Sequence, residues 1–208
     1  MSIETVEQEH KSYHRWYPLF SAFMRLRFRY RVVGSEHIPQ GAAMICANHT
    51  SNFDPMLLIK VFGKNNFLHI MAKDSLYKIP VLRGFLRSIG MISVKRDMND
   101  VIAVKTALGY LKGGEKVGIF PEGHRVMSEE ESVSAKTGAV KLADRTGVPV
   151  VPVFIPRKKP IFRRVTVTIG APYYVNPSRQ KLLPEETARL SAELMERIMS
   201  LDGDAARK

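Results

Sequence analysis

Short apolar runs that alternate with helical stretches constrain the fold of this chain more than any other feature of its sequence. The runs have the length and composition of buried strands, and turn residues close most of them. Helical stretches of about ten to fifteen residues separate several of the runs. This alternation predicts an α/β fold, a single domain with a largely parallel central sheet flanked by helices. The length of 208 residues fits one such domain.

The expected elements follow from the period of the apolar residues and from the turn residues between them. A strand is expected to begin at Phe28, and further strands cover 42–48, 67–73, 91–96, 116–120, 148–155 and 163–170. Helices are expected over 54–62, parts of 75–90, 100–114, 136–147 and 184–201. In the first of these helices, Asp54 is expected at the N-cap and Pro55 at the first helical position.

An amphipathic helical attachment is expected near the N-terminus. Pro18 suits the first turn of a helix of about ten residues, with apolar side chains at Leu19, Phe20, Phe23, Met24 and Leu26. This helix either packs on the protein's own core or contacts a membrane interface. The second interpretation is slightly favoured, because the segment is basic, lacks acids and has Trp16 at its edge. We therefore expect a membrane-interface segment (1–27), a main domain (28–201) and a flexible tail (202–208).

The charge of the chain indicates an anionic partner. The net charge is +12 and the isoelectric point is about 9.9, which suits nucleic acid, anionic lipid or a phosphorylated substrate. Two stretches, 11–31 and 157–184, carry Lys and Arg and no acid, and aromatic residues interleave with the first. Such a mixture suits a membrane interface or a groove for single-stranded nucleic acid. A nucleic-acid partner is not expected, because the sequence has no recognised motif for one.

The sequence places the protein on a membrane rather than across it. No segment reaches the roughly 18 apolar residues of a transmembrane helix. The N-terminus lacks the basic-then-apolar order of a secretory signal. The single cysteine, Cys46, excludes an internal disulfide and fits a reducing compartment. We expect a peripheral or monotopic protein on the cytoplasmic face of a membrane.

The stretch "NHTSNFDP" places His49 five positions before Asp54, directly after an expected strand. An imidazole is the natural general base near neutral pH, and a carboxylate on its other nitrogen fixes the tautomer. On this stretch alone, a helix N-cap at Asp54 is favoured about two to one over a catalytic role. The same spacing recurs at His69 and Asp74, where His69 lies inside an apolar run and is expected to be a packed core residue.

Two further stretches place charged residues directly after strands. "GIFPEGHR" carries Glu122 and Arg125, and "IGMISVKRD" carries Arg96. Arginine forks suit phosphate oxygens, although each arginine alone is more often part of a surface ion pair. The carboxyl ends of parallel strands lie at one edge of a sheet. The sequence therefore predicts that one histidine, two carboxylates and two arginines meet at that edge.

These blocks resemble those of the glycerolipid acyltransferases of the 1-acylglycerol-3-phosphate acyltransferase (PlsC-like) family. "NHTSNFDP" resembles the family's His-four-residues-Asp motif, and "GMISVKR" the block that ends in a phosphate-binding arginine. "FPEGHR" resembles the Phe-Pro-Glu-Gly-Thr-Arg block, and "VPVVPVFI" the late apolar strand. The resemblance covers roughly 28–175. His124 and Val126 depart from it, because they stand where the family usually has threonine and serine.

The resemblance implies a role for each matching residue. His49 would be the general base and Asp54 its orienting partner, while Arg96 would hold the phosphate of the acceptor. The residues that would shape the acceptor site are Glu122, Gly123, Arg125 and, with less support, Lys136. The implied co-substrates are a thioester of acyl carrier protein or coenzyme A and a lysophosphatidate acceptor at the membrane. No metal and no cofactor are implied.

Two alternatives remain open on the sequence. The same chemistry could act on another acceptor, such as glycerol 3-phosphate or a lysophospholipid with a head group. A non-catalytic basic module that binds lipid or nucleic acid would explain the charge. Such a module would not explain the blocks that contain His49, Arg96 and Glu122. The sequence does not indicate an oligomeric state.

Overall fold

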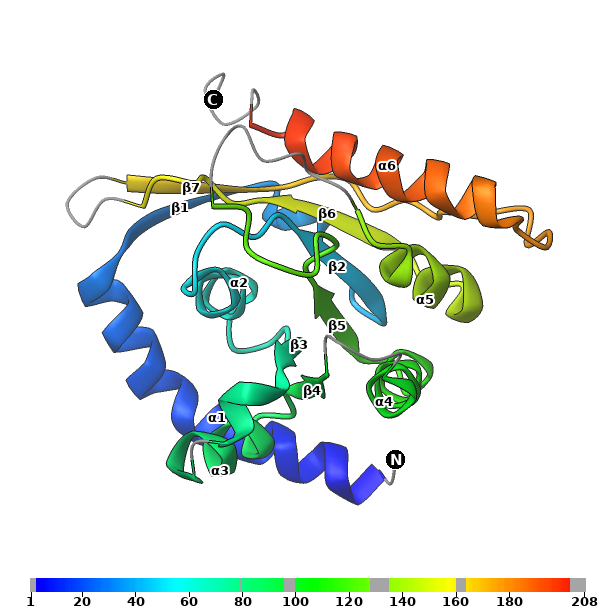
Figure 1. The fold of residues 1–208 in the computed structure, drawn as a ribbon. Coiled ribbons are helices and arrows are strands. Elements are labelled where there is room, and N and C mark those ends of the chain that lie inside the picture. The colour runs from blue at the N-terminus through cyan, green and yellow to red at the C-terminus, as the bar shows by residue number, and fades with distance from the viewer. Residues whose placement is uncertain (1–2, 79, 96–99, 128–134, 160–163, 203–208) are drawn as a thin grey trace.

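The protein is a three-layer α/β/α domain in which helices cover both faces of one sheet (Figure 1). The computed structural model describes residues 3–78, 80–95, 100–127, 135–159 and 164–202. The described strands are β1 (Arg29–Val33), β2 (Ala43–Ala47), β3 (Leu68–Lys73), β4 (Ile92–Val94), β5 (Lys116–Ile119), β6 (Val150–Phe154) and β7 (Arg164–Ile169). The predicted fold class, a single α/β domain with a largely parallel sheet, is confirmed.

The sheet has the strand order β1-β7-β6-β2-β5-β3-β4. Strands β6, β2, β5, β3 and β4 pair in parallel, β7 is antiparallel to β6, and β1 is parallel to β7. The carboxyl ends of β6, β2 and β5 are therefore neighbours at one edge. This places the segments that follow these three strands side by side, although they are far apart in the sequence.

The helices are α1 (Ile3–Arg27), α2 (Asp54–Phe62), α3 (Pro80–Ser88), α4 (Val101–Lys112), α5 (Gly138–Thr146) and α6 (Pro184–Ser200), with short 3₁₀ turns at Ser35–His37 and Asp74–Lys78. Helices α1, α2 and α3 pack on one face of the sheet, and α4, α5 and α6 pack on the other. Successive residues of β2 point to opposite faces: Ile45 and Ala47 join the first core, and Met44 and Cys46 the second. The sheet is thus buried on both sides, as its near-continuous apolar strands predicted.

The N-terminal helix is longer than expected. Helix α1 runs over 25 residues from Ile3 and contains Pro18 in its interior, so the expected start at Pro18 is wrong. The first half of the helix packs on the domain through Tyr13, which is 3% exposed and contacts Phe67. A proline inside a helix removes one hydrogen bond and kinks it, which accounts for the bend of α1 in Figure 1.

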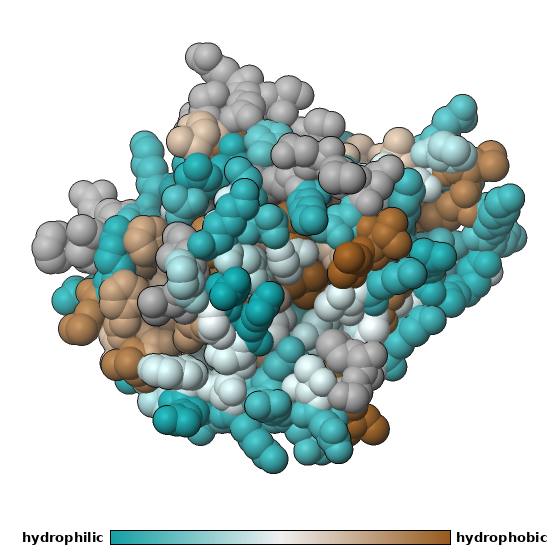
Figure 2. Space-filling model, turned by 60° about the horizontal axis from the view of Figure 1, so that its bottom comes forward, coloured by the Kyte–Doolittle hydropathy of each residue, from teal (hydrophilic) through white to brown (hydrophobic). Residues whose placement is uncertain are grey.

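Part of the N-terminal helix packs on the protein's own core, and its contact with a membrane interface stays a prediction. Tyr13 and Met24 are buried, and α1 contacts α2 and α3. In the second half of the same helix, Trp16, Leu19, Phe23 and Leu26 remain exposed, as does Ile3 at its start. Figure 2 shows hydrophobic side chains gathered at the left of the face that carries α1. Within the described part of the chain, no helix is both long enough and apolar enough to span a bilayer.

Candidate active site

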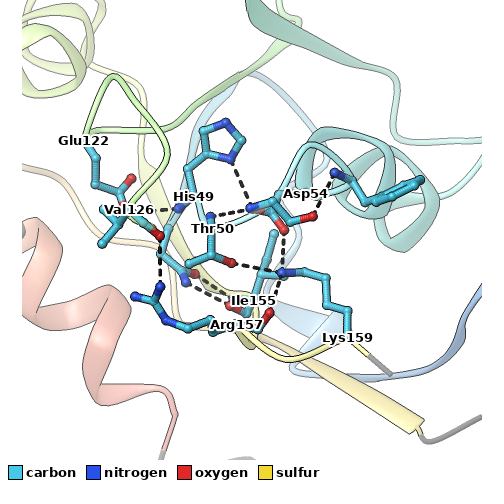
Figure 3. A network of polar contacts seen from close by, with 11 residues as sticks. His49, Thr50, Asp54, Glu122, Val126, Ile155, Arg157 and Lys159 are labelled. Atoms are coloured by element: carbon cyan, nitrogen blue, oxygen red, sulfur yellow. Dashed lines mark hydrogen bonds and ion pairs between the residues drawn. The ribbon is translucent and has the colours of Figure 1, made fainter. Parts of the chain in front are cut away.

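The candidate site lies at the carboxyl ends of β6, β2 and β5. The chain leaves β2 at Ala47 and reaches His49 in the turn before α2, while β5 leads into Glu122 and β6 leads toward Lys159. Figure 3 shows these side chains gathered around that turn. Open α/β sheets hold their ligands at this edge, so the fold places the predicted residues where chemistry is expected.

His49 is oriented by a carboxylate and by an aromatic ring. Its Nδ1 lies 3.1 Å from Oδ2 of Asp54, and its ring stacks on Phe120 with the ring centroids 4.2 Å apart. Because the carboxylate accepts a hydrogen bond, Nδ1 carries the proton and Nε2 of the neutral ring keeps its lone pair. His49 is 6% exposed and lines an apolar cavity. This is the geometry of a general base with a fixed tautomer.

Asp54 is fully buried and held as a carboxylate. Its Oδ2 accepts hydrogen bonds from the backbone amides of Thr50 and Ser51, each 2.7 Å long, and its Oδ1 lies 2.8 Å from Nζ of Lys159. Burial by itself raises the pKa of this group. The hydrogen bond from His49 and the charge of Lys159 outweigh burial, so the pKa of Asp54 lies below its usual value.

The expected N-cap position of Asp54 is wrong. Helix α2 begins at Asp54 itself, with Phe53 at the cap position and no side-chain cap hydrogen bond. The carboxylate turns back to the amides of Thr50 and Ser51, because there it meets convergent donors that include His49. The structure therefore shows the pairing with His49, which the sequence alone placed second to capping.

Hydrogen bonds join the three segments that form the site. Asn48 donates from Nδ2 to the carbonyl of Ile155 (2.8 Å) and accepts at Oδ1 from the amide of Ile155 (2.7 Å). The amide of Val126 donates to the carbonyl of His49 over 2.9 Å. Lys159 also donates to Oγ1 of Thr50 over 3.0 Å. The backbone on both sides of His49 is thereby fixed to the segments after β5 and β6 (Figure 3).

Glu122 holds the backbone of His49 and is itself poorly solvated. Its Oε1 accepts from the amide of His49 over 3.0 Å, while its buried Oε2 has no hydrogen-bond partner among the described residues. Glu122 is 2% exposed, and burial, with a smaller contribution from the charge of Asp54, raises its pKa to about 7. The carboxyl group therefore changes its protonation state near neutral pH.

An apolar cavity of about 530 Å³ opens beside His49. Helices α1, α2 and α3 and the end of β3 supply most of its wall, and Phe120 and Arg125 line it together with His49. The volume lies within the usual range of small-molecule sites, roughly 300–1,000 Å³. The aromatic part of the wall comes mainly from α1, through Tyr13, Trp16, Tyr17 and Phe20. A long hydrocarbon group is the kind of ligand that such a wall favours.

A second cavity, of about 540 Å³, adjoins the first and is more basic. The two share Met71, Ala72, Lys73 and Phe120 in their walls. The basic side chains of the second cavity are Lys73, Lys95, Lys136 and Arg145. Gly123 also lines it, with φ at +70°, and a Cβ there would lie 2.8 Å from the Lys136 side chain. The positive φ favours glycine at this position, whereas the flexible end of the Lys136 side chain could shift to admit a Cβ.

The structure brings some of the predicted site residues into contact and places others in the walls of the two cavities. His49, Asp54 and Glu122 form one hydrogen-bonded group, whereas Arg125 lines the apolar cavity, and Gly123 and Lys136 the basic one. Arg96 lies outside the described residues; it follows β4, whose carboxyl end faces the same edge of the sheet.

The two departures from the family motif have different environments. His124 is exposed, and its Nδ1 lies 2.9 Å from the backbone oxygen of Glu122. Val126 is 2% exposed and packs in the protein interior. The change at 126 therefore alters packing, while the change at 124 places an imidazole at the surface beside the site.

Sequence reasoning missed Asn48 and Lys159. Asn48 directly precedes His49, but no spacing rule marks an amide that pairs with a strand 107 positions later. Lys159 lies in the acid-free stretch 157–184, where its charge was attributed to the surface. Its side chain is in fact only 6% exposed and is paired with Asp54. A lysine after the late apolar strand was the only signal available for it.

The second His–Asp spacing is structural, as predicted. His69 is fully buried, and its Nδ1 lies 2.8 Å from the carbonyl of Gly90. Asp74 is turned elsewhere and accepts a hydrogen bond from Ser93 over 3.1 Å. Spacing alone therefore does not form a pair.

Comparison with known proteins identifies a family and several similar proteins. The Acyltransferase family model matches residues 29–156. A 1-acyl-sn-glycerol-3-phosphate acyltransferase of Borreliella burgdorferi is 32% identical over 70% of this chain and 58% of its own length. One of Bacillus subtilis is 28% identical over 86% of this chain and 91% of its own length. The chain thus spans little more than half of the Borreliella relative.

A solved structure is also similar to this chain. The 1-acyl-sn-glycerophosphate acyltransferase PlsC of Thermotoga maritima superposes with a TM-score of 0.69 and 26% sequence identity. The match covers 96% of this chain and 80% of that one. It therefore includes the N-terminal helix as well as the sheet.

Proposed function

Because the chain belongs to the acyltransferase family, we propose that it transfers a fatty acyl group from a thioester to the sn-2 hydroxyl of 1-acylglycerol 3-phosphate. The product is phosphatidate. The observation that carries the proposal is the buried His49–Asp54 pair, whose imidazole lines an apolar cavity. Relatives that are named for this reaction support the choice of acceptor.

The chemistry needs one well-placed base. Nε2 of His49 accepts the proton of the acceptor hydroxyl as its oxygen attacks the thioester carbonyl. Asp54 stabilises the imidazolium through Nδ1. The tetrahedral intermediate then expels the thiolate, which takes up the proton, and an ester remains. A thioester is activated and its thiolate leaves readily, so direct transfer requires no acyl-enzyme. Cys46 takes no part, because burial raises the pKa of its thiol and the residue has no exposed surface.

The two cavities suit the two substrates. The apolar cavity beside His49 would take a fatty chain, and the basic cavity would take the glycerophosphate head of the acceptor. In this arrangement Lys136 and Arg125 reach the acceptor from either side of the Glu122–Gly123 turn, and Arg96 binds its phosphate. The donor is a thioester of acyl carrier protein or coenzyme A. We expect the reaction to need no metal or cofactor.

Access to a bilayer would come from α1. Trp16, Leu19, Phe23 and Leu26 recur at helical spacing and are all exposed, and Arg15 and Arg25 lie among them. Aromatic residues and arginines suit the headgroup region of an anionic membrane, where each basic residue contributes roughly 1 kcal/mol. Because residues of the same helix line the apolar cavity, a lipid substrate would have a short path from the interface to His49. The membrane in question would be reached from its cytoplasmic face.

A mass-resolved transfer assay with purified protein tests the proposal. It crosses acyl-carrier-protein and acyl-coenzyme A donors with 1-acylglycerol 3-phosphate, glycerol 3-phosphate and a lysophospholipid that has a head group. Preferential formation of phosphatidate is expected. Preference for another acceptor would move the activity to that substrate, and tight, salt-sensitive RNA binding without any transfer would favour a non-catalytic module.

The assigned role of Arg96 has its own test. Arg96→Ala should raise KM for phosphomonoester acceptors. KM for acceptors whose phosphate is a diester with a head group should be much less affected. Arg83→Ala, an exposed arginine on α3, is the matched control. An equal effect of Arg96→Ala on every acceptor would exclude phosphate binding by this residue.

A further inference from the structure

A second histidine cluster lies at the opposite edge of the sheet from His49. It consists of His10 on α1, His69 near the start of β3 and Glu115 directly before β5. The ligand atoms of these three side chains all lie within 4.8 Å of one another. The reaction proposed above uses none of them, because they lie at the amino ends of the strands whose carboxyl ends lead to the site.

The carbonyl of Gly90 determines which ring nitrogen of His69 donates. Its Nδ1 lies 2.8 Å from the carbonyl oxygen of Gly90, which can only accept, so Nδ1 donates. In the neutral ring, Nε2 then carries a lone pair. This atom is fully buried and has no hydrogen-bond partner among the described residues. A buried acceptor without a donor is unfavourable, and it needs either a proton or a cation.

The atom opposite this lone pair is a carboxylate oxygen. Oε2 of Glu115 lies 3.7 Å from Nε2 of His69 and 3.1 Å from Nε2 of His10. A lone pair and a carboxylate repel each other at that distance unless a positive charge lies between them. Tetrahedral Zn²⁺ with bonds of about 2.0–2.2 Å holds neighbouring ligand atoms roughly 3.3–3.6 Å apart. The two separations from Oε2 of Glu115 lie just below and just above this range.

We propose that His10, His69 and Glu115 bind a divalent transition-metal ion, Zn²⁺ by the character of its two nitrogen ligands and one oxygen ligand, and that the ion fastens α1 to the amino edge of the sheet. Two imidazoles and one carboxylate form a recognised ligand set for Zn²⁺ and leave a fourth position open. The ion would be structural, and the acyl transfer proposed above does not depend on it.

The surroundings of the cluster have the features of a metal site. The carbonyl of Gly90 on Nδ1 of His69 is the kind of outer hydrogen bond that orients a histidine ligand. Tyr110 stacks on His69 with centroids 3.5 Å apart, and Phe67 packs edge-on against both His10 and His69. These rings enclose His69, while the side chains of His10 and Glu115 are 36% and 18% exposed and leave the cluster accessible to an ion.

Charge and space around the cluster agree with the proposal. Both carboxylate oxygens of Glu9 accept from the hydroxyl of Tyr110 at 2.9 Å, which places a second carboxyl group beside the cluster. Gly90 has φ at +62°, and a Cβ there would lie 2.6 Å from Nδ1 of His69 and 2.9 Å from Oε2 of Glu9. Glycine at this position lets the side chains of His69 and Glu9 approach the backbone closely.

Metal content and metal titration test the proposal. The full chain is purified without a histidine tag, which would itself bind metal, stripped with a chelator and titrated with Zn²⁺ and with Co²⁺. We expect one ion per chain and the visible absorption of tetrahedral Co²⁺. Zn²⁺ at about 100 times its Kd should raise the Tm by roughly 5–10 °C. The absence of stoichiometric binding would show that a proton, and not a metal, satisfies His69.

Two ligand variants and one control locate the ion. His10→Ala and Glu115→Gln should each weaken Kd for Zn²⁺ by more than about 100-fold. Both residues are partly exposed, so these variants are expected to fold. His14→Ala, an exposed histidine one turn further along the same helix, should bind as the unmodified protein does. Equal binding by all three variants would place the metal elsewhere and overturn the proposal.

Discussion

His49 and His69 belong to two regions that look alike in sequence and differ in purpose. Each histidine is buried, each stacks on an aromatic ring, and each has Nδ1 fixed by an oxygen atom. His49 follows a strand, whereas His69 lies near the start of one. In a parallel sheet this difference places them at opposite edges.

The partners of the two rings account for the difference in purpose. The carboxylate of Asp54 accepts from Nδ1 of His49, so Nε2 of the neutral ring keeps its lone pair, and the ring lines a cavity that can admit a substrate. A neutral carbonyl holds His69, and its Nε2 is enclosed by Glu115 and His10. A histidine becomes a base when a carboxylate and an opening lie on opposite sides of its ring.

The largest expected effect comes from His49→Ala. Loss of a positioned general base should lower kcat by about 10²–10⁴-fold in the transfer assay. Asp54 keeps Lys159 and two backbone amides as partners, so the Tm and binding to anionic vesicles should stay close to those of the unmodified protein. A near-normal rate in this variant would disprove the proposed mechanism.

Lys159→Met tests how the carboxylate of the first region is kept charged. Removing one partner of a buried ion pair costs about 3–5 kcal/mol of stability. Because Lys159 helps to hold the pKa of Asp54 down, its loss should raise that pKa and move the acid limb of the pH–rate profile to higher pH.

Lys159→Arg provides the control for this variant. It should restore part of the stability and most of the profile, because it keeps the positive charge. An unchanged profile in Lys159→Met would mean that the lysine serves packing alone.

His69→Ala should give the reverse of the His49 result. The side chain fills the core and hydrogen-bonds Gly90, so its removal should lower the free energy of unfolding by about 2–4 kcal/mol. Chemical denaturation measures this loss, while kcat of the fraction that remains folded should change less than about threefold. A large fall in kcat with normal stability would show that His69, like His49, takes part in the reaction.

Glu122→Gln has the smallest expected effect, and it concerns pH. The pKa of Glu122 is about 7 in the folded protein and near 4.5 when unfolded, so the folded state binds the proton more tightly. Its contribution to stability therefore decreases as the pH rises from about 4.5 to 7 and stays lost above that.

Glutamine cannot ionise, yet its oxygen can still accept from the amide of His49. Between pH 5 and pH 8, the free energy of unfolding should fall by roughly 1–3 kcal/mol less in the variant than in the unmodified protein. Urea denaturation across this pH range measures the difference. Parallel curves for the two proteins would mean that Glu122 is ionised throughout.

The strands and most helices could be predicted because their signals are local. The apolar runs around Ile45 and Val151 mark strands, and the apolar period of 184–201 marks α6. The start of α1 was missed, because its first turns are polar and are held by distant partners such as Tyr110 and Glu115. Tertiary contacts of this kind leave no periodic signal within the segment itself.

By itself, the sequence determined the α/β class, the position of each strand and the presence of His49 and Asp54 after one of them. Only the tertiary structure decided the distant neighbours of each histidine, because they come from other strands. Glu122 reaches His49 across 73 positions, and Lys159 reaches Thr50, in the same turn, across 109. The order in which strands pair sets such neighbours, and it depends on how the whole chain buries its apolar surface.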